Sequence, residues 1–248
     1  MKLEKIILWL DRTLKVASFD DVSNNGLQVD RIPSSSTTQS DNLKSNNQTI
    51  STVAFAVDAS VKAVEQAAKA GAQLLVVHHG ISWGGGIKRV TGGVGNVIRA
   101  ALKHNLAIAA FHLPLDAHPV LGNNAQLAKL LGLKKIKKAF SYHGNVIGLV
   151  GSVGSARSVG VGGRIISVPR GMIGVCSGGA GEFAEEAKAL GCDLYVTGEA
   201  SWGEVIAAEN CGMKMICAGH YETEVFGVRA LAKAMKKALK LRTVDLTK

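Results

Sequence analysis

Short apolar runs alternate with amphipathic stretches along most of the chain, a pattern typical of α/β proteins. Residues 52–58, 73–77 and 106–111 are continuous apolar runs, as expected of parallel strands that are buried on both faces. Helical patterns over 60–70 and 95–104 lie between or beside these runs. We therefore expect a strand–helix–strand–helix–strand order in this part of the chain.

A second series repeats this order further along. It comprises strands at 172–176, 193–196 and 213–217, helices at 182–190 and 201–210, and a long basic helix from about 221 to 240. The first helix of each series ends in glycine, at Gly71 and Gly191. The matching order indicates an internal duplication. The sequence thus predicts an α/β fold of two similar parallel-sheet halves, residues 1–132 and 133–248.

Composition narrows the class of protein. Apolar residues make up 47% of 248 residues, which is enough for a hydrophobic core and excludes overall disorder. The first fifteen residues read as an amphipathic helix and not as a signal peptide, and no apolar run is long enough to span a membrane.

The four cysteines lack CxxC spacing, so we expect free thiols in a cytoplasmic protein. Residues 33–49 are polar and of low complexity, and we expect a surface loop or insertion there.

Charge is unevenly distributed along the chain. The 29 basic residues outnumber the 19 acidic ones, and Asp116 is the only carboxylate between Glu65 and Glu182. The electrostatic field of this basic excess attracts anions, whether phosphates, nucleotides or nucleic acid. Solvated surface lysines explain the excess equally well. A lone acid in a basic region needs a local reason, so Asp116 is a candidate functional residue.

Polar side chains follow the predicted strands where each strand ends. His78 and His79 follow the second strand directly, and each half carries a His-x-x-x-carboxylate motif after its third strand, His112 with Asp116 and His220 with Glu224. Ligands of open α/β sheets bind beyond the carboxyl ends of the strands. The sequence therefore places all these candidate residues at such ends.

Metal binding is the chemistry that this set favours. Adjacent side chains on a strand diverge, so two neighbouring metal ions suit His78 and His79 better than a single ion does. His220 and Glu224 are four residues apart and share one helix face. Imidazole with carboxylate suits zinc, iron, manganese or nickel. Each residue alone has an ordinary structural interpretation, such as a cap or a hydrogen-bonded strand end; the coincidence of all of them favours a metal site.

Other catalytic motifs are weaker or missing. The glycine-rich stretches 84–89 and 92–95 contain Lys88 and Arg89 and could cradle a phosphate, but no GxxxxGK[ST] P-loop occurs. The sequence also lacks a GxSxG nucleophile motif. Covalent catalysis is therefore disfavoured.

Five short motifs, taken in order, resemble the Nif-three-like family of dinuclear-metal proteins, often labelled GTP cyclohydrolase type 2 homologues. They are Asn25-Gly26-Leu27-Gln28-Val29, His78-His79-Gly80, His112-Leu113-Pro114-Leu115-Asp116, Thr197-Gly198-Glu199 and Gly219-His220-Tyr221-Glu222-Thr223-Glu224. The double histidine and the GHYxTE-type motif carry most of the specificity. The resemblance extends from Asn25 to about Ala230.

The resemblance implies a site for two divalent transition-metal ions (zinc, iron or manganese), a fold of two α/β parts, and assembly into homohexameric rings. The implied metal ligands are His78, His79, Asp116, His220 and Glu224, with Glu224 as the bridge. His112 falls at the position of a ligand or catalytic proton shuttle. Many relatives have a histidine shortly after the TGE-type motif, whereas this chain has Ser201-Trp202-Gly203 there.

Two classes of function follow from these expectations. The leading one is a metal-dependent hydrolase acting on a nucleotide such as GTP, by cyclohydrolase-type ring opening, or on another phosphate-bearing molecule, with Lys88, Arg89 or Arg99 near the phosphates. The alternative is a metal-containing oligomeric ring that binds single-stranded nucleic acid or protein partners without turnover. Aromatic residues make up only 5% of the chain, so stacking platforms for single strands are scarce.

Overall fold

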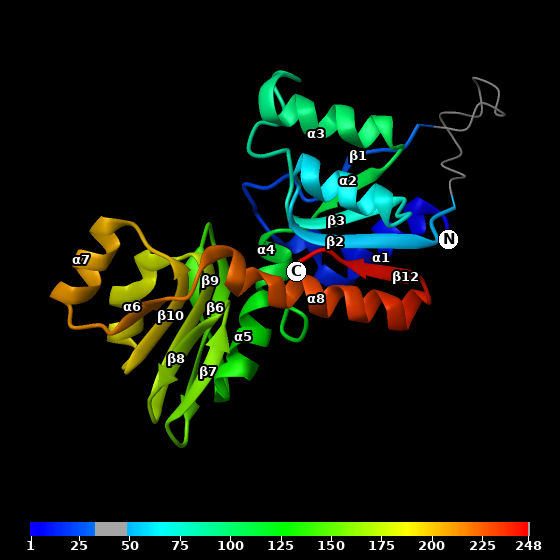
Figure 1. Cartoon of the computed structure of the whole chain (residues 1–248). Helices are drawn as coiled ribbons and strands as arrows, with labels where there is room; N and C mark the ends of the chain where they lie inside the picture. Colours follow the sequence, from blue (N-terminus) through cyan, green and yellow to red (C-terminus); the bar gives the residue numbers. More distant parts are fainter. Residues whose placement is uncertain (33–48, 248) are drawn as a thin grey trace. The chain divides into compact units, whose positions relative to one another are not determined.

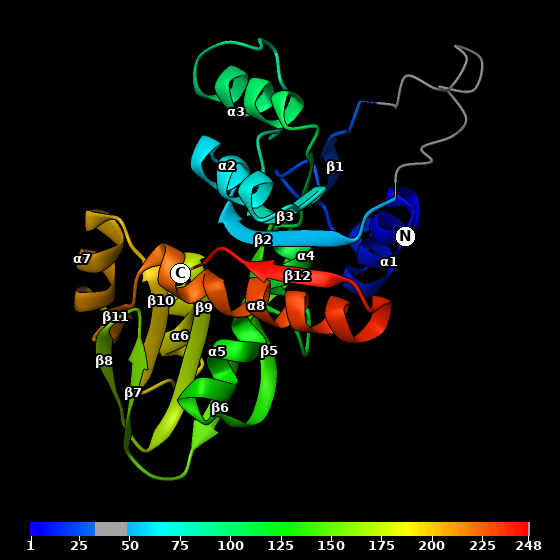
Figure 2. The same ribbon diagram turned by 45° about the vertical axis from the view of Figure 1, so that its right-hand side comes forward.

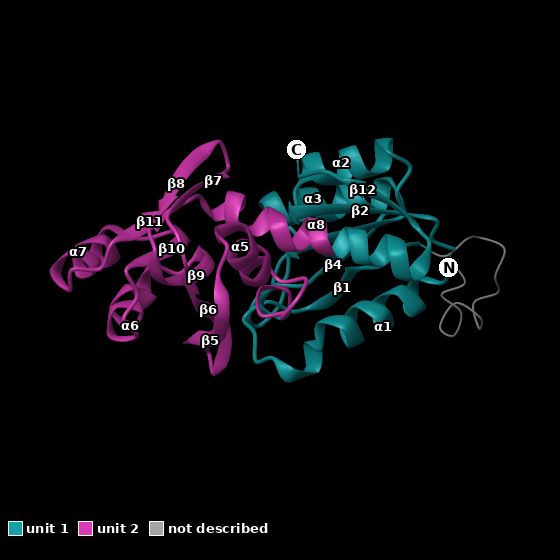
Figure 3. Ribbon diagram, turned by 90° about the horizontal axis from the view of Figure 1, so that it is seen from below, with its two compact units in different colours: residues 1–114, 231–248 teal, residues 115–230 magenta. Residues whose placement is uncertain are grey.

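The computed structural model describes residues 1–32 and 49–247 (Figure 1), so the expected loop at 33–49 lies outside the described residues except for Thr49. The chain forms two compact units (Figure 3). Unit 1 contains residues 1–114 and 231–248, and unit 2 contains residues 115–230. The two halves predicted from the sequence, residues 1–132 and 133–248, were defined by the repeated order of strands and helices and not by contacts. That division stays a prediction.

Unit 1 is built on a five-stranded sheet. Its strand order is β1 (Gly26–Val29), β4 (Ala107–Ala110), β3 (Leu74–His79), β2 (Thr52–Asp58) and β12 (Arg242–Asp245). The three strands β2, β3 and β4 are parallel, as predicted, and β12 joins β2 in parallel, whereas β1 is antiparallel to β4. The sheet is therefore mixed, with a parallel centre.

Helices cover both faces of this sheet (Figure 2). The helices α2 (Val61–Lys69) and α3 (Gly92–Lys103) lie on one side and α1 (Leu3–Leu14) lies on the other. The predicted amphipathic character of α1 is confirmed, because Leu3, Ile6, Leu10 and Leu14 are all buried at helical spacing. On the opposite side, apolar residues of α2 and α3 pack with the sheet in one core cluster.

Unit 2 has a second five-stranded sheet and a separate two-stranded one. The larger sheet has the order β11 (Met215–Cys217), β10 (Leu194–Glu199), β9 (Gly171–Gly179), β6 (Asn145–Val153) and β5 (Lys134–Tyr142), and β7 (Arg157–Val161) pairs with β8 (Arg164–Val168). The strands β9, β10 and β11 are parallel, whereas β6 is antiparallel to both of its neighbours. The helices are α5 (Asn123–Leu131), α6 (Ala184–Ala189) and α7 (Trp202–Asn210).

Both sheets contain three parallel strands in the same spatial order, third, second and first along the chain (β4-β3-β2 and β11-β10-β9). This order agrees with the two matching series in the sequence. A common origin of the two series stays a prediction. The structure adds the strands β1, β5–β8 and β12, which the apolar pattern did not reveal.

The chain passes between the units inside two helices, α4 (Leu113–Asp116) and α8 (His220–Leu239). His112 therefore belongs to unit 1, whereas Asp116, His220 and Glu224 belong to unit 2. Among the helices of residues 1–32 and 49–247, none has the length and apolar character required to cross a bilayer.

Candidate functional site

Three histidines meet at the carboxyl ends of two neighbouring strands in unit 1. His78 and His79 end β3, and His112 comes two residues after β4. Their ring centroids are 4.5 to 5.7 Å apart, and one nitrogen of each ring lies within 4.8 Å of the others. His78 is fully buried, and the other two are partly buried. Imidazoles at this spacing are a group that could hold a metal ion.

Each of these rings is oriented through its Nδ1 atom by an oxygen acceptor, which requires the proton on Nδ1 and leaves the lone pair on Nε2. The pairs are His78 with Phe111 O at 3.0 Å, His79 with Asp58 Oδ1 at 2.9 Å, and His112 with Asp21 Oδ1 at 2.9 Å. Metal-binding histidines show this arrangement, because the acceptor fixes both the tautomer and the ring orientation. The donor set therefore fits a divalent transition metal.

The Asn25 motif supports the histidines. Asn25 Oδ1 accepts a hydrogen bond from the His112 backbone N–H at 2.7 Å, and Asn25 Nδ2 donates to Asp21 Oδ2 at 2.8 Å. Burial opposes the charged form of Asp21, yet the hydrogen bond and charge of His112 and further donors from Ser23 and Asn25 keep the pKa of Asp21 below its usual value. Asp21 is thus an ionised support for His112.

Gln28, in the same motif, holds the loop that follows His79 and packs against Gly80. Gln28 Oε1 accepts from the backbone N–H groups of Ile81 at 2.7 Å and Ser82 at 3.2 Å. A Cβ atom at Gly80 would overlap Gln28 Oε1 and lie 2.5 Å from Ala110 Cβ. A larger residue at Gly80 would therefore displace the loop that follows β3.

A tryptophan stands beside the three histidines. The Trp83 ring centroid is 5.1 Å from that of His112, with the planes at 75°, and 6.0 Å from that of His79. Trp83 Nε1 donates to Gly80 O at 2.9 Å, and the residue is 37% exposed. Trp83 therefore provides a fixed aromatic edge next to the candidate donors, which the sequence analysis did not identify.

Unit 2 brings together two carboxylates and a histidine. The carboxylates of Asp116 and Glu224 offer oxygen atoms within 4.8 Å of one another, and His220 Nε2 lies 3.2 Å from Glu224 Oε1. Asp116 and Glu224 are 6% and 2% exposed. Buried carboxylates require compensating partners, and a cation that both carboxylates contact is one such partner.

Hydrogen bonds within unit 2 hold both carboxylate-bearing segments. Asp116 Oδ1 accepts from Asn123 Nδ2 at 2.8 Å and from Ser177 Oγ at 3.2 Å. Asn123 Oδ1 in turn accepts from the Gly227 N–H of α8 at 2.7 Å. Asn123 thus links the Asp116 carboxylate to the helix that carries Glu224.

His220 has the same kind of support as the histidines of unit 1. Its Nδ1 lies 2.9 Å from Glu199 Oε1, the glutamate of the TGE motif. The hydrogen bond and charge of Glu224, together with those of Glu199, raise the pKa of His220 to about 9, although partial burial opposes this. The raised pKa favours the imidazolium form, so a cation that binds at this ring competes with a proton.

The glycine of the TGE motif has a packing role. A Cβ atom at Gly198 would lie 2.5 Å from Gly178 O, 2.7 Å from Thr223 Oγ1 and 2.8 Å from His220 Cα. Thr223 Oγ1 itself accepts from the Gly178 N–H and donates to His220 O. Gly198 therefore allows the first turn of α8 to pack closely on β9 and β10.

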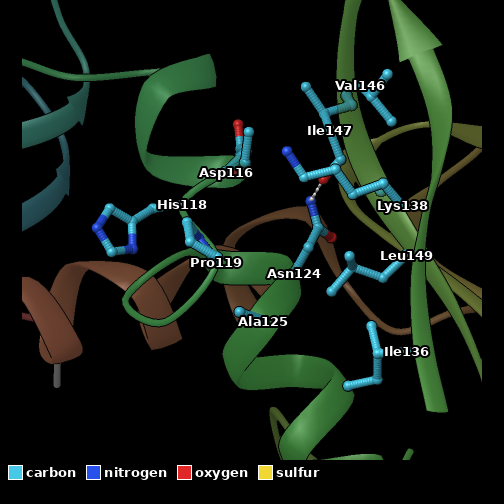
Figure 4. A pocket seen from close by; sticks show the side chains of 12 residues that line it. Asp116, His118, Pro119, Asn124, Ala125, Ile136, Lys138, Val146, Ile147 and Leu149 are labelled. Atoms are coloured by element: carbon cyan, nitrogen blue, oxygen red, sulfur yellow. Dashed lines mark hydrogen bonds between the residues drawn. The ribbon is translucent and has the colours of Figure 1, made fainter. Parts of the chain in front are cut away.

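A pocket of about 280 Å³ in unit 2 opens next to Asp116 (Figure 4). Its walls come from the segment 116–125 and from the hairpin of β5 and β6. The pocket gives a ligand a place to lie beside one of the candidate donors.

The three cations predicted to contact phosphates do not line the pocket beside Asp116. Lys88 and Arg89 are exposed on the loop before α3, and Arg99 Nη2 donates to Asn96 Oδ1 at 2.6 Å. None of these three cations is among the residues that line the pocket beside Asp116. Their role in binding a triphosphate stays a prediction.

The sequence analysis did not identify Asp58 and Asp21, the carboxylates that contact Nδ1 of His79 and His112. Asp58 ends β2, so the strand-end rule that selected the histidines could also have selected Asp58. Asp21 carried no such signal, because it is 91 residues away from His112 in sequence. Asn123 and Ser177 likewise carried none.

Replacement of Asp58 by alanine is expected to weaken metal binding about 10- to 100-fold, because His79 would lose the acceptor that orients its ring. Asp58 is exposed, so stability should change by no more than about 0.5 kcal/mol. Titration of the metal-free protein with zinc, followed by calorimetry, measures the affinity. Glu65→Ala removes an exposed carboxylate from α2 and should leave affinity unchanged; equal losses in both variants would contradict the role of Asp58.

The fold is a two-sheet α/β arrangement, and its histidine and carboxylate side chains include groups that could hold a metal ion. A family model described as Duf34/NIF3 (NGG1p interacting factor 3) matches residues 1–247. The chain belongs to this family, as its motifs indicated.

Curated relatives support this membership. A protein of Pyrococcus horikoshii named GTP cyclohydrolase 1 type 2 homolog is 36% identical, with 98% of this chain and 97% of that protein covered. A protein of Deinococcus radiodurans with the same name is also 36% identical, with 92% and 86% covered.

Solved structures confirm the fold. Protein ybgI, described as of unknown function, is 27% identical with a TM-score of 0.81, over 99% of this chain and 98% of that one. Reduced HcgD from Methanocaldococcus jannaschii is 22% identical with a TM-score of 0.79 over the same shares, which is evidence for the fold alone.

Proposed function

We propose that the chain binds about two divalent transition-metal ions and acts as a metal-dependent hydrolase on a nucleotide or another phosphate-bearing molecule. The proposed ligands are His78, His79, Asp116, His220 and Glu224. One observation carries the proposal. In each of the four motif histidines, His78, His79, His112 and His220, the Nδ1 atom contacts an oxygen acceptor, so Nε2 is the atom that faces a metal ion. Solvated or purely structural histidines do not need such a repeated arrangement.

The donor chemistry favours zinc, iron or manganese, because imidazole and carboxylate are present and no thiolate is. When bound, such ions supply Lewis acidity and a hydrolytic nucleophile near neutral pH. The protein contributes the orientation of the rings and the burial of Asp116 and Glu224. Burial strengthens the attraction between these carboxylates and a cation, since the local dielectric constant is lower than that of water.

His112 is the proposed proton-transfer residue. It lies beside His78 and His79, and its Nδ1 contacts the ionised Asp21. The Asp21 carboxylate stabilises the imidazolium that forms when Nε2 takes a proton, as a carboxylate behind a catalytic histidine does. His112 can therefore accept a proton from the attacking water and return it to the leaving nitrogen or oxygen.

GTP is the first substrate to test. Relatives such as the Pyrococcus horikoshii protein are named GTP cyclohydrolase 1 type 2 homolog, and the net charge of +10 favours the approach of an anion. The proposed reaction adds water at C8 of the purine and opens the five-membered ring.

We expect the protein to turn over GTP when it is loaded with at least one of zinc, iron(II) or manganese. Turnover should disappear when a chelator is added and return when metal is added back. Product formation is measured by liquid chromatography, with metal content determined on the same samples. His112→Gln should lower kcat about 100-fold while metal content stays unchanged. Metal-loaded protein that converts neither GTP nor other nucleotides would contradict the hydrolase proposal; protein that binds no metal would contradict the ligand proposal.

The alternative function as a nucleic-acid-binding ring has weaker support. Lys134, Lys135, Lys137 and Lys138 are exposed on β5, an edge strand. Lysines on an edge strand also protect it from pairing with other chains. This structural role accounts for the lysine cluster without a nucleic acid.

A further inference from the structure

The pocket beside Asp116 has a wall on each side that is rigidly held. Asn124 is buried, its Nδ2 donates to Ile147 O at 2.9 Å, and its Oδ1 accepts from the Ser177 N–H at 2.7 Å. Figure 4 shows Asn124 between the two walls with the first of these bonds. The bonds join α5 to β6 and β9, so the space between the walls is fixed before any ligand arrives.

The hairpin side of the pocket depends on a glycine. A Cβ atom at Gly148 would overlap Phe140 Cδ2 and lie 2.9 Å from Val175 O. Since Gly148 lets β6 pack closely on its neighbours, the hairpin cannot easily shift to fill the pocket. The hairpin wall of the pocket is therefore packed closely against the rest of the sheet.

Apolar side chains line this space and remain partly in water. Ile136 and Val146 line the pocket and are 46% and 41% exposed. Ile147 and Leu149 add apolar surface from the same hairpin, and Pro119 faces them from the other wall. Apolar surface gathered at the mouth of a cavity indicates a place where an apolar group is covered on binding.

A single ammonium group accompanies these apolar walls. Lys138 lines the pocket, and Figure 4 shows its side chain extending from β5 over the cavity. Asp116 is the only acidic residue among the lining side chains, and no ion pair of Lys138 occurs within residues 1–32 and 49–247. The lysine is therefore available to an acidic group of a ligand.

We propose that this pocket binds the ring of an organic anion, an aryl or heteroaryl group that carries a phosphate or carboxylate. The ring lies between the apolar walls, Lys138 pairs with the acidic group, and the end of the ligand at Asp116 is presented to the candidate metal centre. This proposal rests on the proposed function in one respect, the assignment of Asp116 as a metal ligand. It restricts the substrates of that centre to anions that contain a ring.

The test uses the full-length, metal-free protein and anilinonaphthalene sulfonate, a fluorescent probe that combines aromatic rings with an acid. Binding should raise its emission. Lys138→Gln should weaken binding about tenfold, because one charge-assisted contact is lost. Ala125→Phe, which fills the pocket from the α5 side, should also weaken it. Phenyl phosphate should displace the probe, whereas inorganic phosphate and phenol at the same concentration should not.

Lys137→Gln is the matched control. Lys137 is the next residue on the same strand, and adjacent residues of a strand face opposite sides. It has the same charge and is also exposed, but it does not line the pocket. Binding should be unchanged in this variant. Equal losses in both lysine variants would mean that the probe responds to net charge only, and this result would overturn the proposal.

Two further outcomes also overturn it. Displacement by inorganic phosphate alone would mean a simple anion site. Probe binding that falls as protein concentration rises, with a matching increase in mass by light scattering, would mean that a second copy of the chain covers the pocket. His220→Ala should bind the probe as the unaltered protein does, so a failure of the metal proposal is distinguishable from a failure of the pocket proposal.

Discussion

Replacing His220 with alanine is expected to take the metal content from about two ions per chain to less than one. His220 is a proposed ligand, and its Nδ1 is already held by Glu199. Loss of the ring also removes the partner that lies 3.2 Å from the buried Glu224 carboxylate. We expect a stability cost of about 1–3 kcal/mol from that lost contact, which a domain of this size tolerates without unfolding.

The measurement is elemental analysis by mass spectrometry on protein purified without chelator, together with thermal unfolding. His104→Ala removes an exposed histidine that follows α3 and should keep the full metal content. An unchanged metal content in His220→Ala would show that the ligand assignment is wrong. A loss in His104→Ala as well would show that the metal binds to surface histidines.

Gly198→Ala is expected to disturb the carboxylate-bearing helix without changing any charged or donor atom. Two of the three atoms that the new Cβ would meet at 2.5 to 2.8 Å belong to the backbone, Gly178 O and His220 Cα. Since neither can rotate away, the first turn of α8 must shift and carry His220 and Glu224 with it. We expect a loss of about 1–3 kcal/mol in the free energy of unfolding and about 100-fold in metal affinity or turnover, as a displacement of about 1 Å causes in a catalytic site.

Urea unfolding and zinc titration measure the two effects of Gly198→Ala. Gly203→Ala is the matched control, because the same substitution in α7 meets no heavy atom within 4 Å. Alanine is the better helix former, so this control should be neutral or stabilise the protein by up to about 1 kcal/mol. If Gly198→Ala bound zinc as tightly as the control, the packing of α8 against the TGE motif would not position the donors.

The buried strands were predictable because they leave a simple signal in the sequence. The predicted strand 52–58 coincides with β2, six of whose seven residues are buried. By contrast, β5 contains four lysines and its first five residues are all exposed, so no apolar run marks it. Its pairing with β6 depends on contacts between strands, and a pattern along one segment does not contain that information.

The clustering of the three histidines was predictable for a different reason. Parallel strands bring their carboxyl ends to one edge, so His78, His79 and His112 were expected to lie close together, and within unit 1 they do. The supporting acceptor Asp21 was not predictable, because no regular spacing relates it to His112. Local rules thus bring together candidate ligands at strand ends and could also have selected Asp58, whereas Asp21 comes from a distant segment that carries no such signal.

The acceptors behind the histidines have a consequence for the approach of an anion. In unit 1 the histidine rings contact Asp21 and Asp58. In unit 2 His220 contacts Glu199 and Glu224, and the carboxylate of Asp116 lies near that of Glu224. A protein with only 19 acidic residues thus gathers five of them around its candidate donors. Before cations bind, these groups repel an anion at short range, although the basic surface attracts it at long range. On the proposed function, bound cations offset this repulsion and strengthen the final approach of a negatively charged group to the candidate ligands themselves.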